Sequence, residues 1–107
     1  MVLPVLPGKQ ESLIAFANSV MGERLAEYEI SQQSVTKESW FFQPTPMGDV
    51  IIVYFVSVDP GAVFAGLAES QEPFDVWFRA QVLNCTGVDL TQLPAGLPPR
   101  IFHWERK

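Results

Sequence analysis

The sequence predicts an α+β fold of the ferredoxin-like βαββαβ type, and three observations lead to it. A short apolar segment precedes a helix-period pattern, two strongly apolar strands flank a turn, and two helix-start signals precede the final segment. This order matches a four-stranded antiparallel sheet with its helices on one face, here with a split first helix and an extra helix before the last strand. The 107 residues fit one domain, 1–107.

The N-terminal part predicts a strand and a broken helix. Val2–Leu6 reads as a strand, with Pro4 at an edge or at a position whose nitrogen makes no ladder hydrogen bond. An apolar stripe at helical spacing then follows. Its members are Leu13, Phe16, Ala17, Val20 and Met21. A straight helix would place Arg24 within this stripe, so we expect a break near Gly22 and a more polar helical segment over 23–33.

An apolar β-hairpin follows the helices. Segments 39–43 and 50–56 predict its strands, and Gly48 and Asp49 are typical of the turn between them. Both strands carry apolar residues on both faces, whereas helices on one side of a sheet cover one face. A second copy of the chain covers the other face without extra sequence, so we expect a homodimer through the open sheet face.

Two further helices are predicted after the hairpin. Asp59 caps free amides and Pro60 suits a first helical position, so a helix starts there with Val63, Phe64 and Leu67 facing inward. Pro73 starts the next helix, which ends at Gly87. Its apolar residues at helical spacing are Phe74, Trp77, Phe78, Val82 and Cys85. The thiol lies near the end of this stripe, where the helix dipole disfavours a thiolate, so we interpret it as a core residue.

The C-terminal part predicts a connector and a closing strand. The Pro- and Gly-rich segment Leu93–Pro99 reads as an ordered connector, and its contact with a partner chain stays open. Arg100–Glu105 is expected to be the last strand. On one face of that strand, His103 and Glu105 form either a proton-transfer pair or the polar face of an ordinary terminal strand.

Composition excludes several classes of function. The net charge is −5 and no Lys/Arg cluster is present, so nucleic acid is not an expected partner. No apolar run approaches the roughly 20 residues of a spanning helix, so we expect no membrane association. The single cysteine forms no intrachain disulfide, so we predict a cytoplasmic protein. Strong metal ligands do not cluster in the sequence, so we predict no metal, and we expect no cofactor.

Each set of candidate polar or aromatic residues has two possible roles. Arg24, Glu27 and Tyr28 lie about one helical turn apart and either hold an anionic or phenolic ligand or form a solvated ion pair. The aromatic side chains either pack the core and dimer interface or line a ligand pocket. The candidate pocket residues are Trp40, Phe42, Gln43, Tyr54, Trp77, Phe78 and Trp104. Gln43 lines a cavity in one alternative and bonds turn backbone in the other.

Three stretches resemble a known superfamily. They are Leu6–Lys9, Thr36–Asp49 and Pro73–Phe78, and they are similar to small uncharacterised bacterial proteins of the dimeric α+β barrel type, related to antibiotic-biosynthesis-monooxygenase-like domains. The resemblance implies a dimeric barrel. It leaves function open, because the superfamily includes cofactor-free oxygenases, haem-degrading enzymes, isomerases and proteins without known activity.

Two hypotheses of function remain. The first is a dimeric module that binds a small ligand or acts as a scaffold, since no acid, base or nucleophile constellation is visible. The second is a cofactor-independent monooxygenase or isomerase acting on a small aromatic or polyketide-like compound, with His103, Arg24 and Tyr28 as candidate catalytic residues. A cavity holding one of these three residues beside aromatic walls is the observation that favours the enzyme.

Overall fold

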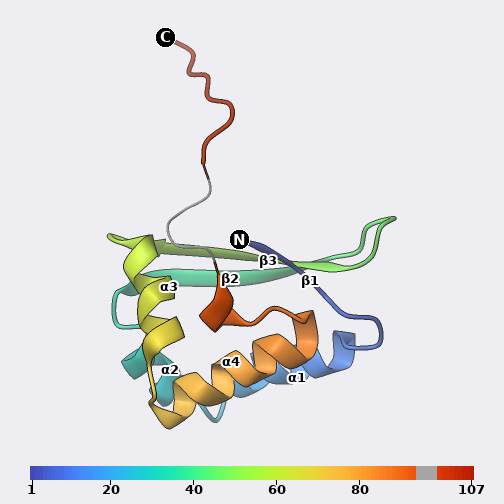
Figure 1. Cartoon of the computed structure of the whole chain (residues 1–107), viewed down its shortest axis with the longest axis vertical. Helices are drawn as coiled ribbons and strands as arrows, with labels where there is room; N and C mark the ends of the chain where they lie inside the picture. Colours follow the sequence, from blue (N-terminus) through green and yellow to red (C-terminus); the bar gives the residue numbers. More distant parts are fainter. Residues whose placement is uncertain (94–98) are drawn as a thin grey trace.

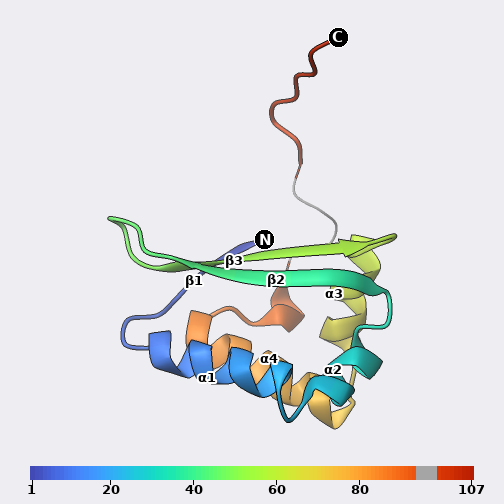
Figure 2. The ribbon, with the colours of Figure 1, turned by 180° about the vertical axis from the view of Figure 1, so that it is seen from behind.

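An antiparallel sheet covers a layer of helices in the computed structural model, which describes residues 1–93 and 99–107. Figures 1 and 2 show the sheet on one side and all the labelled helices on the other. The elements are β1 (Val2–Pro4), α1 (Gln10–Met21), α2 (Leu25–Ser31), β2 (Val35–Gln43), β3 (Val50–Ser57), α3 (Pro60–Glu69), α4 (Pro73–Thr86) and the short 3-10 helix η1 (Leu90–Gln92). The predicted α+β class is therefore confirmed.

The sheet has the order β1-β3-β2 within the described residues, with both pairs antiparallel. Met1 and Val53 exchange two backbone hydrogen bonds of 2.9 and 2.7 Å, and the Val5 amide donates to the Asp49 carbonyl at 2.9 Å. Because bonding groups alternate along a strand, the Pro4 nitrogen faces away from β3. Proline is thus tolerated in this strand because it lies on the free edge, as its position in the sequence predicts.

The register of the hairpin divides its side chains between two faces. Trp40 lies opposite Val53 and Phe41 opposite Ile52, so neighbouring residues point to opposite sides of the sheet. Trp40 and Val53 pack against the buried core on the helix side. Phe41 and Tyr54 lie on the other side, where 55% and 52% of their surfaces are exposed. The described chain therefore leaves an apolar sheet face open, which we call the outer face.

The predicted break in the first helix is confirmed. Leu13, Phe16 and Val20 of α1 are buried, and α1 ends at Met21. At Gly22 a Cβ atom would lie 2.9 Å from the carbonyl oxygen of Asn18, so the chain turns where a side chain has no room. The following helix, α2, has no buried residue, in agreement with its polar sequence.

The ends of α3 and α4 follow the predicted capping signals. The Asp59 carboxylate accepts a hydrogen bond from the Ala62 amide at 3.1 Å, and Pro60 is the first residue of α3. Gly87 ends α4 with φ of 75°, a conformation that favours glycine. Cys85 is 0% exposed, which confirms its assignment to the core, and burial raises the pKa of its thiol against the opposing charge of Lys9.

The prediction that Arg100–Glu105 forms a closing strand is wrong. Arg100–Glu105 has no regular structure, and its segment stands away from the body on the side of the sheet opposite the helices (Figures 1 and 2). Ile101 and Phe102 are 96% and 82% exposed. An extended segment forms a strand only beside another strand that satisfies its backbone groups, and here none is adjacent. The four-stranded ferredoxin-like sheet is therefore incomplete in the described part of the chain.

Two other predictions concern the connector and membrane-spanning helices. Residues 94–98 of the predicted connector Leu93–Pro99 lie outside the described residues. Among the helices that the structure describes, none has the length and apolar character needed to cross a bilayer.

Candidate functional site

A cavity lies between the helix side of the sheet and the helices. Its volume is about 70 Å³ and its walls are predominantly apolar. Phe16 from α1, Trp40 from β2 and Phe78 from α4 contribute aromatic walls, with ring centroids 5.1 to 6.0 Å apart. Val63 and Leu67 line it from α3, which has no fully buried residue. The cavity is thus formed by a rigid aromatic cluster on one side and by a less buried helix on the other.

A carboxylate lies in the wall of this apolar cavity. Glu38 accepts a hydrogen bond from the Tyr28 hydroxyl at 2.7 Å through Oε1 and one from the Trp40 indole N–H at 2.5 Å through Oε2. All three residues line the cavity. Because Glu38 and Trp40 are two apart in β2, they point to the same face of the sheet, and α2 brings Tyr28 across to them. Each oxygen keeps acceptor capacity beyond the bond it makes, so the group can receive a further donor.

Tyr28 is a neutral hydrogen-bond donor at this site. Burial raises the pKa of its hydroxyl well above the ordinary value of 10.0, and the hydrogen bond to Glu38 and the negative charge of that carboxylate raise it further. The phenol therefore remains protonated at neutral pH. It can orient the carboxylate, but it is not a base or nucleophile there.

The raised Tyr28 pKa predicts a loss of stability in alkali. In the unfolded chain a tyrosine loses its proton near pH 10, whereas folded Tyr28 keeps it, so the folded state binds more protons above about pH 10. The free energy of unfolding should therefore decrease as pH rises above about 10 and be independent of this group below that value. Denaturant unfolding at several alkaline pH values measures this slope. In Tyr28→Phe the slope should be smaller, and an equal slope in both proteins would contradict the assignment.

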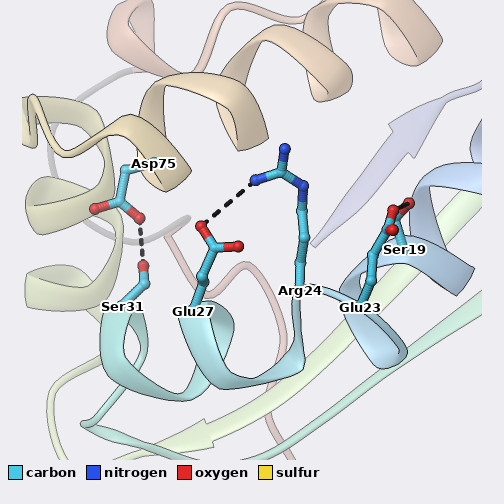
Figure 3. A network of polar contacts seen from close by, with 6 residues as sticks. All are labelled: Ser19, Glu23, Arg24, Glu27, Ser31 and Asp75. Atoms are coloured by element: carbon cyan, nitrogen blue, oxygen red, sulfur yellow. Dashed lines mark hydrogen bonds and ion pairs between the residues drawn. The ribbon is translucent and has the colours of Figure 1, made fainter.

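A polar cleft adjoins the cavity. It has a volume of about 450 Å³ and shares Gln32, Val63 and Leu67 with the cavity. Asp75 is 6% exposed in the cleft wall, and its two oxygens accept hydrogen bonds from the hydroxyls of Ser31 and Ser70. Figure 3 shows Ser31 on α2 pointing to Asp75 on α4. The cleft therefore presents hydroxyl, amide and carboxylate groups next to an apolar chamber.

Arg24 and Glu27 do not join Tyr28 at the cavity. The Arg24 guanidinium lies 3.5 Å from a Glu27 oxygen, as Figure 3 shows, and 4.1 Å from the ring centre of Trp77. Neither residue is among the cavity-lining side chains. The arrangement corresponds to the predicted solvated ion pair, with an added cation–π contact. It does not support the anionic-ligand role considered for Arg24.

His103 also lies apart from the cavity. Its ring nitrogen is 3.7 Å from a Glu105 oxygen, and the two side chains are 49% and 81% exposed. The pair belongs to the projecting C-terminal segment, as does Trp104, which is 60% exposed. The structure therefore does not place these residues with any candidate reacting group.

The remaining aromatic candidates are divided between the two faces of the sheet. Trp40 and Phe78 line the cavity, while Phe42 and Trp77 pack against the core beside it. Tyr54 lies on the outer face. Gln43 donates from its side-chain amide to the Pro44 carbonyl at 2.8 Å, which matches its predicted alternative of bonding turn backbone.

Sequence reasoning missed Glu38 and Asp75. Glu38 stands two residues before Trp40, so strand alternation would have placed it on the core side, where a carboxylate is unusual. Asp75 lies in the first turn of α4, where acidic residues are common for electrostatic reasons, and this ordinary explanation concealed its burial. An acid on the apolar face of a predicted element is the signal that identifies both.

Two kinds of search bear on the site. Across residues 1–93 and 99–107, no group of three or more His, Cys, Asp or Glu side chains is placed to hold a metal ion. Comparisons with protein-family models, with curated proteins and with solved structures give no match. The cavity, the cleft and the groups that line them are therefore what bears on function.

Proposed function

We propose that this protein is a binding module for a small aromatic molecule that carries a hydrogen-bond donor. The observation that carries the proposal is the Glu38 carboxylate, fixed by Tyr28 and Trp40 in the wall of an otherwise apolar cavity. In this proposal a ring packs against the aromatic walls, and a hydroxyl or amine on it donates to the carboxylate. A few convergent polar groups in an apolar chamber are typical of small-molecule sites.

The charges of the site favour neutral or cationic ligands. Among the described residues that line the cavity and the cleft, none is Lys or Arg, whereas Glu38 and Asp75 are acidic. The chain as a whole carries a net charge of −5. A carboxylate or phosphate on the ligand would meet the like charge of Glu38. We therefore propose that the ligand presents donors and carries no negative charge.

The volumes limit the size of the ligand. The cavity of about 70 Å³ exceeds the roughly 10–15 Å³ that one water requires, and it is smaller than the roughly 300–1,000 Å³ of pockets for drug-sized molecules. The neighbouring cleft of about 450 Å³ has room for more. A single ring whose donor meets Glu38 therefore requires the cavity to widen toward the cleft, on the side of α3, which has no fully buried residue.

Proton-transfer catalysis is a second candidate function, and two observations favour it: Tyr28 lines a cavity with aromatic walls, which is the arrangement expected of the enzyme, and Glu38 lies beside it. A carboxylate in an apolar wall can accept a proton from a bound substrate, and neutral Tyr28 can hold it in position. This corresponds to an isomerase acting on a small aromatic or polyketide-like compound. Deuterium exchange into a bound ligand, abolished in Glu38→Gln, would establish this activity; binding without exchange supports the binding module.

Four single-ring probes test the binding proposal. Phenol and benzylamine carry donors, toluene carries none and benzoate is an anion. We expect phenol and benzylamine to bind roughly tenfold more tightly than toluene, because a hydrogen bond to a charged acceptor contributes about 1.5–3 kcal/mol. Benzoate should bind more weakly than toluene. Chemical-shift titration in nuclear magnetic resonance spectra measures the affinities and locates the shifts around Trp40 and Tyr28.

A cavity-filling variant and its matched control complete the experiment. Val63→Phe places a larger side chain at the cavity wall and should abolish probe binding. Leu83→Phe makes a similar increase on the exposed side of α4, where Leu83 is 47% exposed, and should leave binding unchanged. Equal affinities for benzoate and benzylamine, or unchanged binding by Val63→Phe, would refute the proposed site.

We further propose that the module is a homodimer formed through the outer face. Exposed apolar side chains on that face support it, because they gain stability when a partner covers them. They include Val2, Phe41, Tyr54 and Val56, which are 60%, 55%, 52% and 41% exposed. The dimeric α+β barrel expected from the sequence requires the same arrangement of two sheets face to face.

A further inference from the structure

We infer that residues 99–107 form an arm that packs on the outer face of a second copy of the chain. This inference rests on the proposed dimer and adds to it a reciprocal exchange of segments. The outer face of each copy is then covered by the sheet and the arm of the other copy. The arm, the outer face and the distribution of charge support it independently.

The arm carries apolar side chains that contact no core. Ile101, Phe102 and Trp104 are 96%, 82% and 60% exposed, although they are among the large hydrophobic side chains of the protein. Burying such side chains stabilises a protein in proportion to the apolar area removed from water. The arm therefore gains stability from an apolar surface that its own body does not provide in this conformation.

The arm projects in the direction from which a partner would approach. Figures 1 and 2 show it on the side of the sheet opposite α1, α2 and α4. That side is the outer face, where Phe41 and Tyr54 are exposed. A second copy placed sheet to sheet would stand beside the arm, and by two-fold symmetry its own arm would reach the first copy.

The charges of the arm and the body are complementary. Arg100, Arg106 and Lys107 against Glu105 give the arm a formal charge of +2. Because the whole chain has a formal charge of −5, the remainder carries −7. The bodies of two copies repel each other because both carry net negative charge, and the two cationic arms lower this net repulsion; the outer face itself carries Lys37, opposite Val56.

The area available is sufficient for a stable dimer. An aromatic side chain buries about 150–250 Å² when it is fully covered, so the three apolar side chains of each arm bring on the order of 400 Å². The two arms, together with a similar area of the two sheets that they cover, bury on the order of 1,600 Å². Stable interfaces bury about 1,200–2,000 Å².

The first experiment measures the dimer dissociation constant by analytical ultracentrifugation. In Phe102→Asp/Trp104→Asp it should rise roughly 100-fold, because two apolar side chains of each arm lose their burial. These residues make no core contact, so the variant should fold normally, which circular dichroism checks. Met21→Asp is the matched control, since Met21 is 68% exposed at the end of α1, on the helix side of the sheet, and its dissociation constant should be unchanged.

The second experiment locates the arm. A photoreactive benzoyl-phenylalanine at position 102 is irradiated in a mixture of heavy-isotope-labelled and unlabelled copies, and mass spectrometry identifies the joined peptides. We expect cross-links between copies that reach β2 or β3. Cross-links confined to one chain would show that the arm folds back on its own sheet and would overturn the inference.

The outcomes separate the inference from the proposals beneath it. A dimer that persists in Phe102→Asp/Trp104→Asp but dissociates in Phe41→Asp refutes the arm and retains the face-to-face dimer. A monomeric wild-type chain refutes both. Neither result alters the binding of the ring probes to the cavity, which is measured separately on the helix side of the sheet.

Discussion

Phe16→Ala should lower the free energy of unfolding by about 3–5 kcal/mol, the range for removing a buried phenylalanine. Phe16 is 4% exposed, and its ring centroid lies 5.2, 5.4 and 5.1 Å from those of Trp40, Trp77 and Phe78. The substitution removes buried apolar area together with one tilted and two edge-to-face ring contacts. Urea unfolding followed by circular dichroism measures the change.

The size of this effect matters because small domains are marginally stable. Typical free energies of unfolding are about 5–15 kcal/mol, so the variant would lose a large fraction of the total. Ile14→Ala is the control on the same helix, where Ile14 is 48% exposed, and its cost should stay below about 1.5 kcal/mol. Similar costs for the two variants would show that the aromatic cluster is not the centre of the core.

The elements that could be predicted from the sequence are those determined by local chemistry. The α1 stripe, the break at Gly22 and the capped start of α3 each depend on residues within one or two turns. The hairpin depends on strand alternation and a turn of fixed chemistry. Because neighbouring residues decide these features, their positions in the sequence were sufficient to place them.

The final strand could not be predicted correctly, because a strand depends on its neighbour. Arg100–Glu105 has the composition of a strand, but its state depends on whether an unpaired edge or face lies within reach. Sequence patterns identify the segment and leave its partner undetermined. The same residues can be an exposed arm in one copy and an ordered element in an assembly.

The polar half of the candidate site could not be predicted either, because its contacts join segments that are far apart in the sequence. Tyr28 and Glu38 are ten residues apart on a helix and a strand, and Asp75 meets Ser31 across 44 positions. No local pattern joins these pairs. Of the two alternatives for Arg24, the structure shows the solvated ion pair with Glu27, and the guanidinium also lies over Trp77, a contact that no local pattern indicates.

Glu38→Ala should lower the free energy of unfolding by about 2–4 kcal/mol. The substitution leaves the Tyr28 hydroxyl and the Trp40 indole N–H without their acceptor, and each part-buried donor that loses its partner costs about 1–3 kcal/mol. Both lie at an apolar cavity, where few other acceptors exist. Urea unfolding at pH 7 measures the loss, and Glu29→Ala, an exposed acid on α2, should cost less than about 0.5 kcal/mol.

A double-mutant cycle separates the hydrogen bond from the desolvation of the charge. If Glu38 stabilises Tyr28 directly, Tyr28→Phe should cost about 1–2 kcal/mol less in the Glu38→Ala background than in the wild type. If instead burial of the carboxylate costs as much as its two bonds return, Glu38→Ala will be nearly neutral while Tyr28→Phe remains costly. That second outcome would contradict the loss expected for Glu38→Ala and would mean that the carboxylate contributes little to the fold.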